Sequence, residues 1–391
     1  MKVYVAGVDM QPFTKPGQHR PYREMGADAI RGALKDAGID AKLVQQAYAG
    51  YIYGSTGCGQ HVVYDVLQTG IPVFNVNNAC CSGSTAIMLA RQAILSGQVD
   101  CALAVGFEEM QRGPLPVLWQ DREGVSQRIN NLLDDLGAES APNAVRWFGS
   151  AGAQYLNEYD ADPGLFSKIA VKTRNHASAN PNAIFRTPLS EEEVLAAPKV
   201  YGDYLTRLMC CPPSCGAAAA VLVSDRFARR HGISHPVEIV SQTMATDTES
   251  SWEDPLHAVG CEMVRSAAER VFEDAAIGPD DVDVIELHDC FTPNEAISYE
   301  ALGLCPPGGA TQLVADGDNT YGGKWVVNPS GGLMSKGHPI GATGLAQCAE
   351  LVWQLRGQAG TRNVPAARVG LQHNIGLVAG VIMTLYRNGK A

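Results

Sequence analysis

The sequence lacks the marks of nucleic-acid-binding, membrane and secreted proteins. Its net charge is −11 and it has no run of Lys or Arg, so nucleic acids and anionic membranes are poor partners for it. No apolar run is long enough to cross a bilayer. The N-terminus, MKVYVAGVDM, shows no signal peptide, and the C-terminus, YRNGKA, shows no peroxisomal tripeptide. We therefore expect a cytoplasmic protein of bacterial type with no membrane span.

The sequence also lacks the usual motifs for zinc, nucleotides and disulfides. It has no CxxC pair, which argues against zinc, and we expect no metal site. No GxGxxG follows the first predicted strand and no GxxxxGKS or GxxxxGKT occurs, which argues against a bound nucleotide. Eleven cysteines are present, but Cys80–Cys81 and Cys210–Cys211 are adjacent pairs, whose geometry disfavours internal bridges. We expect reduced thiols.

What is present is a soluble composition, 46% hydrophobic and 18% charged, in a chain of 391 residues that is long enough for more than one domain. Helical periodicity over 24–40 and 84–97 alternates with strand-like segments at 45–53 and 100–105. This alternation predicts an α/β protein with a mostly parallel sheet covered on both faces. The polar, irregular stretch 112–205 is predicted to be an insertion, because it is neither low-complexity nor free of aromatics.

The second half of the chain repeats the first. Residues 33–50 align without a gap on 271–288, and the tetrapeptide 83–86 aligns on 341–344. We interpret this as two copies of one α/β unit related by a pseudo-twofold axis, although two similar βα units would also produce so faint a repeat. The same alignment places Cys80 on His338.

Cys80 and Cys81 stand side by side in NNACCSGST (77–85), and neighbours on a helix point about 100° apart, so only one of them can face a given point. The repeat selects Cys80, because Cys81 aligns on Pro339. A thiol at a helix N-terminus has a lowered pKa and is available as the thiolate, so we expect Cys80 to be reactive. The alternative is a buried structural cysteine, which is the commoner role of a free thiol.

Three further stretches carry histidines in glycine-rich or strand-end settings. His338 lies in NPSGGLMSKGHPIGATG, where the glycines indicate close backbone approach. His288 and Cys290 follow a buried strand in VIELHDCFTPNE, at the kind of strand end where α/β proteins place their sites. His373 and Asn374 lie in GLQHNIGLVAGV. Each histidine has a structural alternative as a hydrogen-bonded buried residue.

Together these four stretches resemble the thiolase superfamily, and most closely its sterol-carrier-protein type. The resemblance covers nearly the whole chain and includes CCPPSCGAAAAVLVSD at 210–225. It implies the thiolase fold, in which two pseudo-twofold-related βαβαβαββ halves form a five-layered αβαβα sandwich. The implied parts are an N-terminal half over 1–111 and 206–234, a loop domain inserted in it over 112–205, and a C-terminal half over 235–391.

Position by position, the resemblance implies a catalytic set. Cys80 matches the acyl-accepting nucleophile of the family, and His338 of GHP matches the base that activates it. His288 of HDCF stands where other thiolases have the Asn of an NEAF motif, which helps to bind the carbonyl oxygen of the substrate. Cys290 of HDCF matches the acid/base thiol of this subgroup.

The remaining implied residues have supporting roles. Other thiolases carry the acid/base thiol on a CxG loop near the C-terminus, and this loop reads HNIG here. His373 and Asn374 are therefore assigned a supporting role near the oxyanion. Cys211 and Ser214, which precede the strand-like segment 216–225, are assigned contacts to CoA.

The resemblance implies thiolysis of a 3-oxoacyl-CoA by CoA, to a shortened acyl-CoA plus acetyl-CoA or propionyl-CoA, in fatty-acid or sterol side-chain β-oxidation. It implies no cofactor, since CoA is a substrate, and a homodimer or a dimer of dimers. Two alternatives stay open: a thiolase-like retro-aldolase of sterol breakdown that works with a partner subunit, and a non-catalytic carrier of acyl-CoA or lipid. The presence of Cys80, Cys290 and His338 together disfavours the retro-aldolase.

Overall fold

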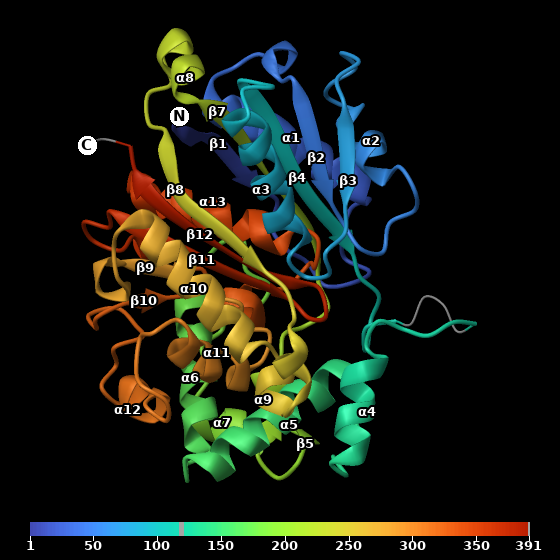
Figure 1. Cartoon of the computed structure of the whole chain (residues 1–391), viewed down its shortest axis with the longest axis vertical. Coiled ribbons are helices and arrows are strands. Elements are labelled where there is room, and N and C mark those ends of the chain that lie inside the picture. Colours follow the sequence, from blue (N-terminus) through green and yellow to red (C-terminus); the bar gives the residue numbers. More distant parts are fainter. Residues whose placement is uncertain (117–120, 390–391) are drawn as a thin grey trace.

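A computed structural model describes residues 1–116 and 121–389 (Figure 1). Residues 117–120 of the predicted loop domain lie outside the described residues. Residues 390–391 also lie outside the described residues. They belong to the predicted C-terminal half and to the last three residues, in which no peroxisomal signal was found. None of the helices in the described ranges is both long enough and apolar enough to cross a membrane.

A ten-stranded sheet runs through the molecule in the order β10-β9-β11-β12-β8-β1-β7-β4-β2-β3. Its strands are β1 (Val3–Met10), β2 (Gln46–Gly50), β3 (Val73–Val76), β4 (Cys101–Glu109), β7 (Cys215–Ser224), β8 (Val237–Ala245), β9 (Val284–Glu286), β10 (Val326–Val327), β11 (Val369–Gly376) and β12 (Gly380–Asn388). A separate two-stranded sheet pairs β5 (Lys199–Tyr201) with β6 (Leu205–Thr206).

The large sheet consists of two five-stranded halves with the same internal order. The order β3-β2-β4-β7-β1 in one half corresponds to β10-β9-β11-β12-β8 in the other, and β1 pairs with β8 at the junction. The repeated segments 33–50 and 271–288 end in the equivalent strands β2 and β9. The pseudo-twofold arrangement predicted from the repeat is therefore confirmed.

The sheet is mixed, so the prediction of a mostly parallel sheet is wrong. β2 and β9 run parallel to both of their neighbours, whereas β4–β7, β7–β1, β11–β12 and β12–β8 are antiparallel. β12 returns directly from β11 in a hairpin that closes between Gly376 and Gly380, and antiparallel neighbours need no crossover helix. In the first half the long insertion joins β4 to β7 in place of a hairpin.

Helices cover the outer faces of the sheet and fill the space between its halves. They are α1 (Tyr22–Ala37), α2 (Cys58–Val63), α3 (Ser82–Leu95), α4 (Gln127–Asp135), α5 (Asn143–Glu158), α6 (Gly164–Ser178), α7 (Glu191–Ala196), α8 (Asp225–His231), α9 (Pro255–Ala258), α10 (Cys261–Ala275), α11 (Thr292–Ala301), α12 (Ala310–Ala315) and α13 (Thr343–Arg356). α1 packs on β1 and β7, and α10 packs on β8 and β12. α3 and α13 contact each other, and α13 touches strands of both halves, so these two helices form the central layer of an αβαβα sandwich.

Local signals explain where the predicted helices end. α1 stops at Gly38, which has a φ of 67°, a left-handed conformation that glycine adopts without strain. α3 begins at Ser82 and buries most of its length, including Ser82, Gly83 and Ser84. Small residues at the start of α3 allow another backbone to come close.

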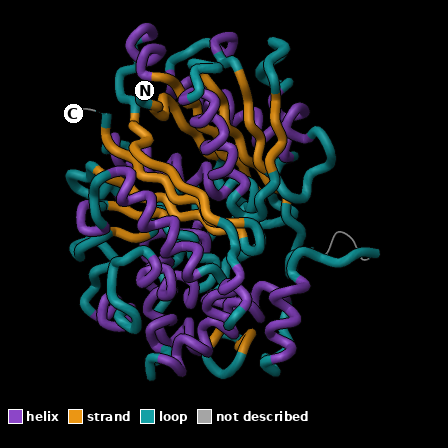
Figure 2. Tube along the Cα trace, in the orientation of Figure 1, coloured by secondary structure: helices purple, strands orange, loops and turns teal. Residues whose placement is uncertain are grey.

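Helices α4–α7 lie together at the end of the molecule below the sheet, within the predicted insertion (Figures 1 and 2). Their aromatic core includes Phe166, which packs against Tyr204. Phe148 of α5 stacks on Phe291 with ring centroids 4.8 Å apart. The insertion therefore packs directly against the segment that carries His288 and Cys290.

Candidate active site

The N-terminal ends of α3 and α13 meet through glycines. A Cβ atom at Gly83 would lie 2.9 Å from the Gly341 carbonyl oxygen, and one at Gly344 would lie 2.2 Å from Ser84 Oγ. Any larger residue at either position would push the two helix ends apart. This close approach brings together the loops that precede the helices, which carry Cys80 and His338.

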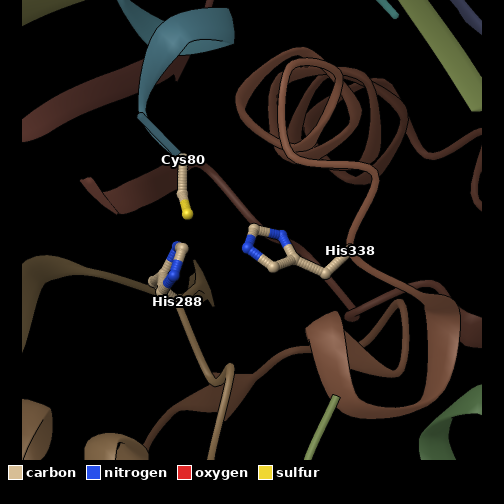
Figure 3. Close-up of side chains that lie close together, drawn as sticks. All are labelled: Cys80, His288 and His338. Carbon is tan, nitrogen blue, oxygen red and sulfur yellow. The ribbon is translucent and has the colours of Figure 1, made fainter. Parts of the chain in front are cut away.

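The two adjacent cysteines have different surroundings. Ala79 has a φ of 46°, and after this turn the partly exposed Cys80 points toward His288 and His338 (Figure 3). The Cys80 Sγ atom and one ring nitrogen of each histidine lie within 4.8 Å of one another. Cys81 is fully buried, and its Sγ donates to the Asn78 carbonyl oxygen at 3.0 Å.

The hydrogen bonds of His338 set its tautomer. The Thr343 hydroxyl donates to the Pro339 carbonyl oxygen at 3.0 Å, so its oxygen accepts from His338 Nδ1, 2.7 Å away. Because Nδ1 carries the proton, Nε2 has a free lone pair. The backbone N–H of His338 also donates to Ser214 Oγ at 3.0 Å, which holds the loop in place.

The hydrogen bonds of His288 set the opposite tautomer. Asn374 Nδ2 lies 3.0 Å from His288 Nδ1, and Asn374 Oδ1 accepts from Ser84 Oγ at 2.7 Å. The amide therefore donates to Nδ1, and the imidazole proton sits on Nε2. Beside one thiol the site thus presents a histidine that can accept a proton and a histidine that can donate a hydrogen bond. Their rings are perpendicular, with centroids 5.0 Å apart.

Burial keeps all three groups neutral in the free protein. It lowers the pKa of His338 to about 3. It also lowers the pKa of His288 well below the usual value, and the neighbouring rings of His338 and His373 add to this effect. Burial, with smaller contributions from Cys81 and Glu108, raises the pKa of Cys80 to about 12. This direction is opposite to the lowering expected from the helix N-terminus, because the loss of hydration around the sulfur outweighs the backbone hydrogen bond that lowers the pKa.

Cys290 and Cys211 lie next to each other. The Cys211 N–H donates to the Cys290 carbonyl oxygen at 2.8 Å. The preceding residue, Cys210, pairs with Phe291 in an isolated antiparallel β-bridge. Burial raises the pKa of both thiols well above the usual value, and each also interacts electrostatically with Cys80. The structure therefore gathers Cys290 and Cys211 around Cys80, as well as His288 and His338.

Two of the other predicted residues have structural contacts. His373 is fully buried on β11, accepts at Nδ1 from the His288 N–H at 3.4 Å, and has no hydrogen-bond partner at Nε2 among the described residues. Ser214 is also fully buried, and its hydroxyl donates to the Pro212 carbonyl oxygen at 2.8 Å while accepting from His338. The hydroxyl proton and one lone pair of Ser214 are thus engaged within the protein, so the predicted contact to CoA would have to use the second lone pair or another atom of the residue.

Glu108 is a residue that the sequence reasoning missed. At the end of β4 it accepts from the backbone N–H groups of Ile52, Tyr53 and Gly341 at 3.0–3.1 Å. Burial raises its pKa to about 7, although these backbone donors oppose the shift. Its position at the end of a buried strand was the signal available in the sequence, the same one that identified His288.

Two groups of three potential metal ligands occur in the part of the chain that the structure describes. One is Cys80, His288 and His338. The other, His257, Cys261 and Glu262, lies at the junction of α9 and α10, away from the predicted site. Neither group was identified from the sequence, because their members are distant in sequence or lack a standard spacing, and the absence of a metal site stays a prediction.

Residues 3–191 match a family model described as the thiolase N-terminal domain, and residues 232–385 match one described as thiolase C-terminal domain-like. Sterol carrier protein 2 of Oryctolagus cuniculus is 49% identical, over 99% of this chain and 72% of its own length. Non-specific lipid-transfer protein-like 2 of Caenorhabditis elegans is 44% identical, over 99% of this chain and 96% of its own. Benzoylsuccinyl-CoA thiolase subunit BbsB of Thauera aromatica is 34% identical, over 96% and 94%.

Solved structures share the fold at low identity. The Ltp2-ChsH2(DUF35) aldolase superimposes with a TM-score of 0.83 at 22% identity, over 100% of this chain and 98% of the other. Human mitochondrial 3-ketoacyl-CoA thiolase in complex with CoA superimposes with a TM-score of 0.74 at 17% identity, over 99% and 98%. The predicted thiolase fold is therefore confirmed.

Proposed function

The chain belongs to the thiolase family, and we propose that it is an acyltransferase that cleaves a 3-oxoacyl-CoA by thiolysis with CoA. One observation carries the proposal: a lone pair on His338 and an N–H on His288 flank the same thiol, Cys80. A nucleophile, a base and an oxyanion donor are the parts that acyl transfer requires.

In the proposed first step, His338 Nε2 takes the proton of Cys80. The resulting thiolate attacks the 3-oxo carbon of the substrate, and His288 Nε2–H donates to the oxygen that becomes negative. His338 is neutral at working pH, because burial lowers its pKa to about 3, so it is ready to accept the proton. The high pKa of Cys80 means that the thiolate forms during the reaction and does not accumulate before it.

In the following steps, the carbon–carbon bond breaks and the enolate of acetyl-CoA or propionyl-CoA leaves. Cys290 protonates its α-carbon and then, as a thiolate, takes the proton of the incoming CoA thiol. CoA attacks the acyl group on Cys80, and the proton held by His338 returns to the Cys80 sulfur. The sum is one 3-oxoacyl-CoA and one CoA converted to two acyl-CoA molecules, with CoA as substrate and no further cofactor.

The relatives support this proposal and suggest the substrates. A thiolase subunit is 34% identical to the chain, and sterol carrier protein 2 is 49% identical to it. We propose 3-oxoacyl-CoA esters of fatty acids or sterol side chains as substrates. We propose a division into a first half (1–111 and 206–234), a loop domain (112–205) and a second half (235–391). In this division the loop domain contains Phe148, which stacks on Phe291 next to Cys290.

The test is an assay of the purified chain alone with CoA and straight, 2-methyl-branched or steroid 3-oxoacyl-CoAs. We expect acetyl-CoA or propionyl-CoA and a shortened acyl-CoA to form in equal amounts. Cleavage that consumes no CoA and needs a second subunit would favour the retro-aldolase, and a folded protein that binds acyl-CoA without any cleavage would favour a carrier. Either result would overturn the proposal.

A homodimer is the proposed assembly, and the end of the sheet supports it. β3 is the last strand on its side, bonded only to β2 among the described strands. Phe74 in its middle is 47% exposed. An unpaired edge with an exposed aromatic side chain suits pairing with the same strand of a second copy. β3 leads directly into the loop 77–80, so such a contact would also brace Cys80.

A further inference from the structure

Cys80, His288 and His338 are also a group of metal-ligand type. A thiol and two imidazoles are ligands that zinc prefers, and both histidines are buried. Their ligand atoms lie within 4.8 Å of one another. Tetrahedral zinc with bonds of about 2.0–2.3 Å needs ligand atoms about 3.3–3.7 Å apart, so small side-chain rotations would bring them into range. An active site of this composition needs a feature that keeps the metal out.

The two imidazoles differ in whether they can bind a metal. A zinc-bound nitrogen must have a free lone pair, and the other ring nitrogen usually donates its proton to a carboxylate or a carbonyl. His338 meets this condition, because Nδ1 donates to Thr343 and Nε2 is free. His288 does not, because Asn374 Nδ2 donates to its Nδ1 and the proton is on Nε2.

We propose that Asn374 is a positioning residue that fixes the tautomer of His288, and that this amide makes the Cys80–His288–His338 group an oxyanion site instead of a zinc site. The inference rests on the proposed function only in taking His288 as the oxyanion donor. The hydrogen bond from Nδ2 puts the N–H of His288 toward Cys80, where the substrate oxygen would lie, and removes the lone pair that zinc would need.

The orientation of the Asn374 amide is itself held by the protein. Its Oδ1 accepts from Ser84 Oγ at 2.7 Å, and Ser84 Oγ accepts from Gln372 Nε2 at 2.8 Å. Turning the amide over would direct Nδ2 at Ser84 and leave the hydroxyl proton without its acceptor, which is unfavourable for a buried group. Asn374 and Ser84 are both fully buried. The hydrogen bonds that join α3 to β11 therefore choose which end of the amide faces His288.

The decisive variant is Asn374→Asp, which has nearly the same size but presents an acceptor to Nδ1. His288 then carries its proton on Nδ1, and zinc bound at Nε2 displaces the Cys80 thiol proton to the buffer. We expect the affinity for Zn²⁺ in equilibrium dialysis to rise at least about tenfold over the parent. Co²⁺ should give a thiolate-to-metal charge-transfer band, and Zn²⁺ should protect Cys80 from iodoacetamide.

The controls separate this site from the rest of the protein. All variants are made in a His257→Asn, Cys261→Ser background, which removes the second group of potential ligands. Asn374→Ala removes the amide without supplying a carboxylate and should bind zinc less tightly than Asn374→Asp. Adding His288→Gln to Asn374→Asp should abolish the gain, because it removes a ligand.

The tautomer of His288 in the parent protein provides a test that does not depend on any variant folding. ¹⁵N NMR of the imidazole nitrogens should show His288 protonated on Nε2 and His338 protonated on Nδ1. A proton on Nδ1 of His288, or zinc affinity in Asn374→Asp no higher than in the parent, would overturn the proposal. Because these readouts need no turnover, they stand or fall separately from the thiolase reaction.

Discussion

The Cys80 thiol and the His338 ring are both neutral in the free protein, because burial raises the pKa of the first and lowers that of the second. A neutral imidazole next to a neutral thiol is a resting state from which one proton transfer produces the nucleophile. At the scale of the residue, the sequence suggested a thiolate that is present before the reaction, whereas the structure indicates a neutral thiol that loses its proton during the reaction.

The first prediction concerns the choice between the adjacent cysteines. Cys80→Ser should lower the thiolysis rate at least about 10³-fold, on the scale seen when covalent nucleophiles are removed. Cys81→Ser, the matched control, should retain acylation, because the Cys81 thiol is fully buried and donates to the Asn78 carbonyl. Acid quench after mixing with an acyl-CoA and mass spectrometry would locate the acyl group. Acyl transfer that survives Cys80→Ser and is lost in Cys81→Ser would reverse the assignment.

The second prediction concerns the pH dependence of alkylation. Only the thiolate reacts with iodoacetamide, and burial raises the Cys80 pKa to about 12. The rate of Cys80 alkylation should therefore rise about tenfold per pH unit from pH 7 to 10 without levelling off. A plateau that begins below pH 8.5 would show that the helix end and His338 stabilise the thiolate after all.

The third prediction separates the two candidates for the acid/base group. Both residues are buried, but the Cys290 thiol interacts electrostatically with Cys80, whereas His373 Nδ1 accepts from the His288 backbone N–H. Cys290→Ala should lose deuterium exchange at the α-carbon of acetyl-CoA far more than His373→Ala does, while acylation of Cys80 persists at a reduced level. Equal losses in the two variants would point to His373 as the group that moves the proton.

At the scale of secondary-structure elements, Glu108 joins the end of β4 to two loops. One loop holds Ile52 and Tyr53, and the other holds Gly341, three residues after His338. A buried carboxyl that accepts three backbone donors connects the two halves of the molecule beside the site. It does so with a pKa raised to about 7, which makes its charge depend on pH near neutrality.

The fourth prediction follows from this pKa. Between the unfolded value of 4.5 and about 7, the folded protein binds more protons at Glu108 than the unfolded chain does, so the free energy of unfolding falls as pH rises. Below pH 4.5 the protonated Glu108 contributes its full stabilisation, up to about 3 kcal/mol. This contribution is lost as the pH rises through about 7. Urea unfolding of Glu108→Gln should lack this slope. Parallel pH profiles for the variant and the parent would contradict the shift.

At the scale of the whole molecule, the continuous sheet ends at β3, and Phe74 is exposed there. The opposite end, β10, is a strand of only two residues, Val326–Val327, both buried. A short, covered strand offers little to a partner, whereas an exposed aromatic side chain on an open edge offers a contact. The two ends of the pseudo-symmetric sheet are therefore not equivalent for assembly.

The fifth prediction tests the assembly through β3. Phe74→Lys should produce monomers, because a charged side chain would replace an apolar one in the proposed contact, once in each copy. Sedimentation velocity measures the outcome. Val125→Lys, at a residue that is 82% exposed, serves as the control and should leave the oligomer intact. An unchanged oligomer in Phe74→Lys would place the interface elsewhere.

Much of the fold was already evident in the sequence by itself. The internal repeat predicted the two halves, and glycine-rich stretches and strand ends pointed to Cys80, His288 and His338, because these signals are local and survive without coordinates. The sheet direction was predicted wrongly, since alternating elements do not show that β12 returns as a hairpin from β11. Glu108 was missed although it ends a buried strand, because nothing near it in sequence reveals the backbone groups that it accepts from.

Only the tertiary structure decided the protonation of the site. The His288–Asn374 bond joins residues 86 apart in sequence, and the Glu108–Gly341 bond joins residues 233 apart. A tautomer depends on which group faces each nitrogen, and a pKa depends on how completely the fold removes water. Both are properties of packing between distant segments, so the identity of the residues follows from the sequence whereas their chemical state follows from the fold.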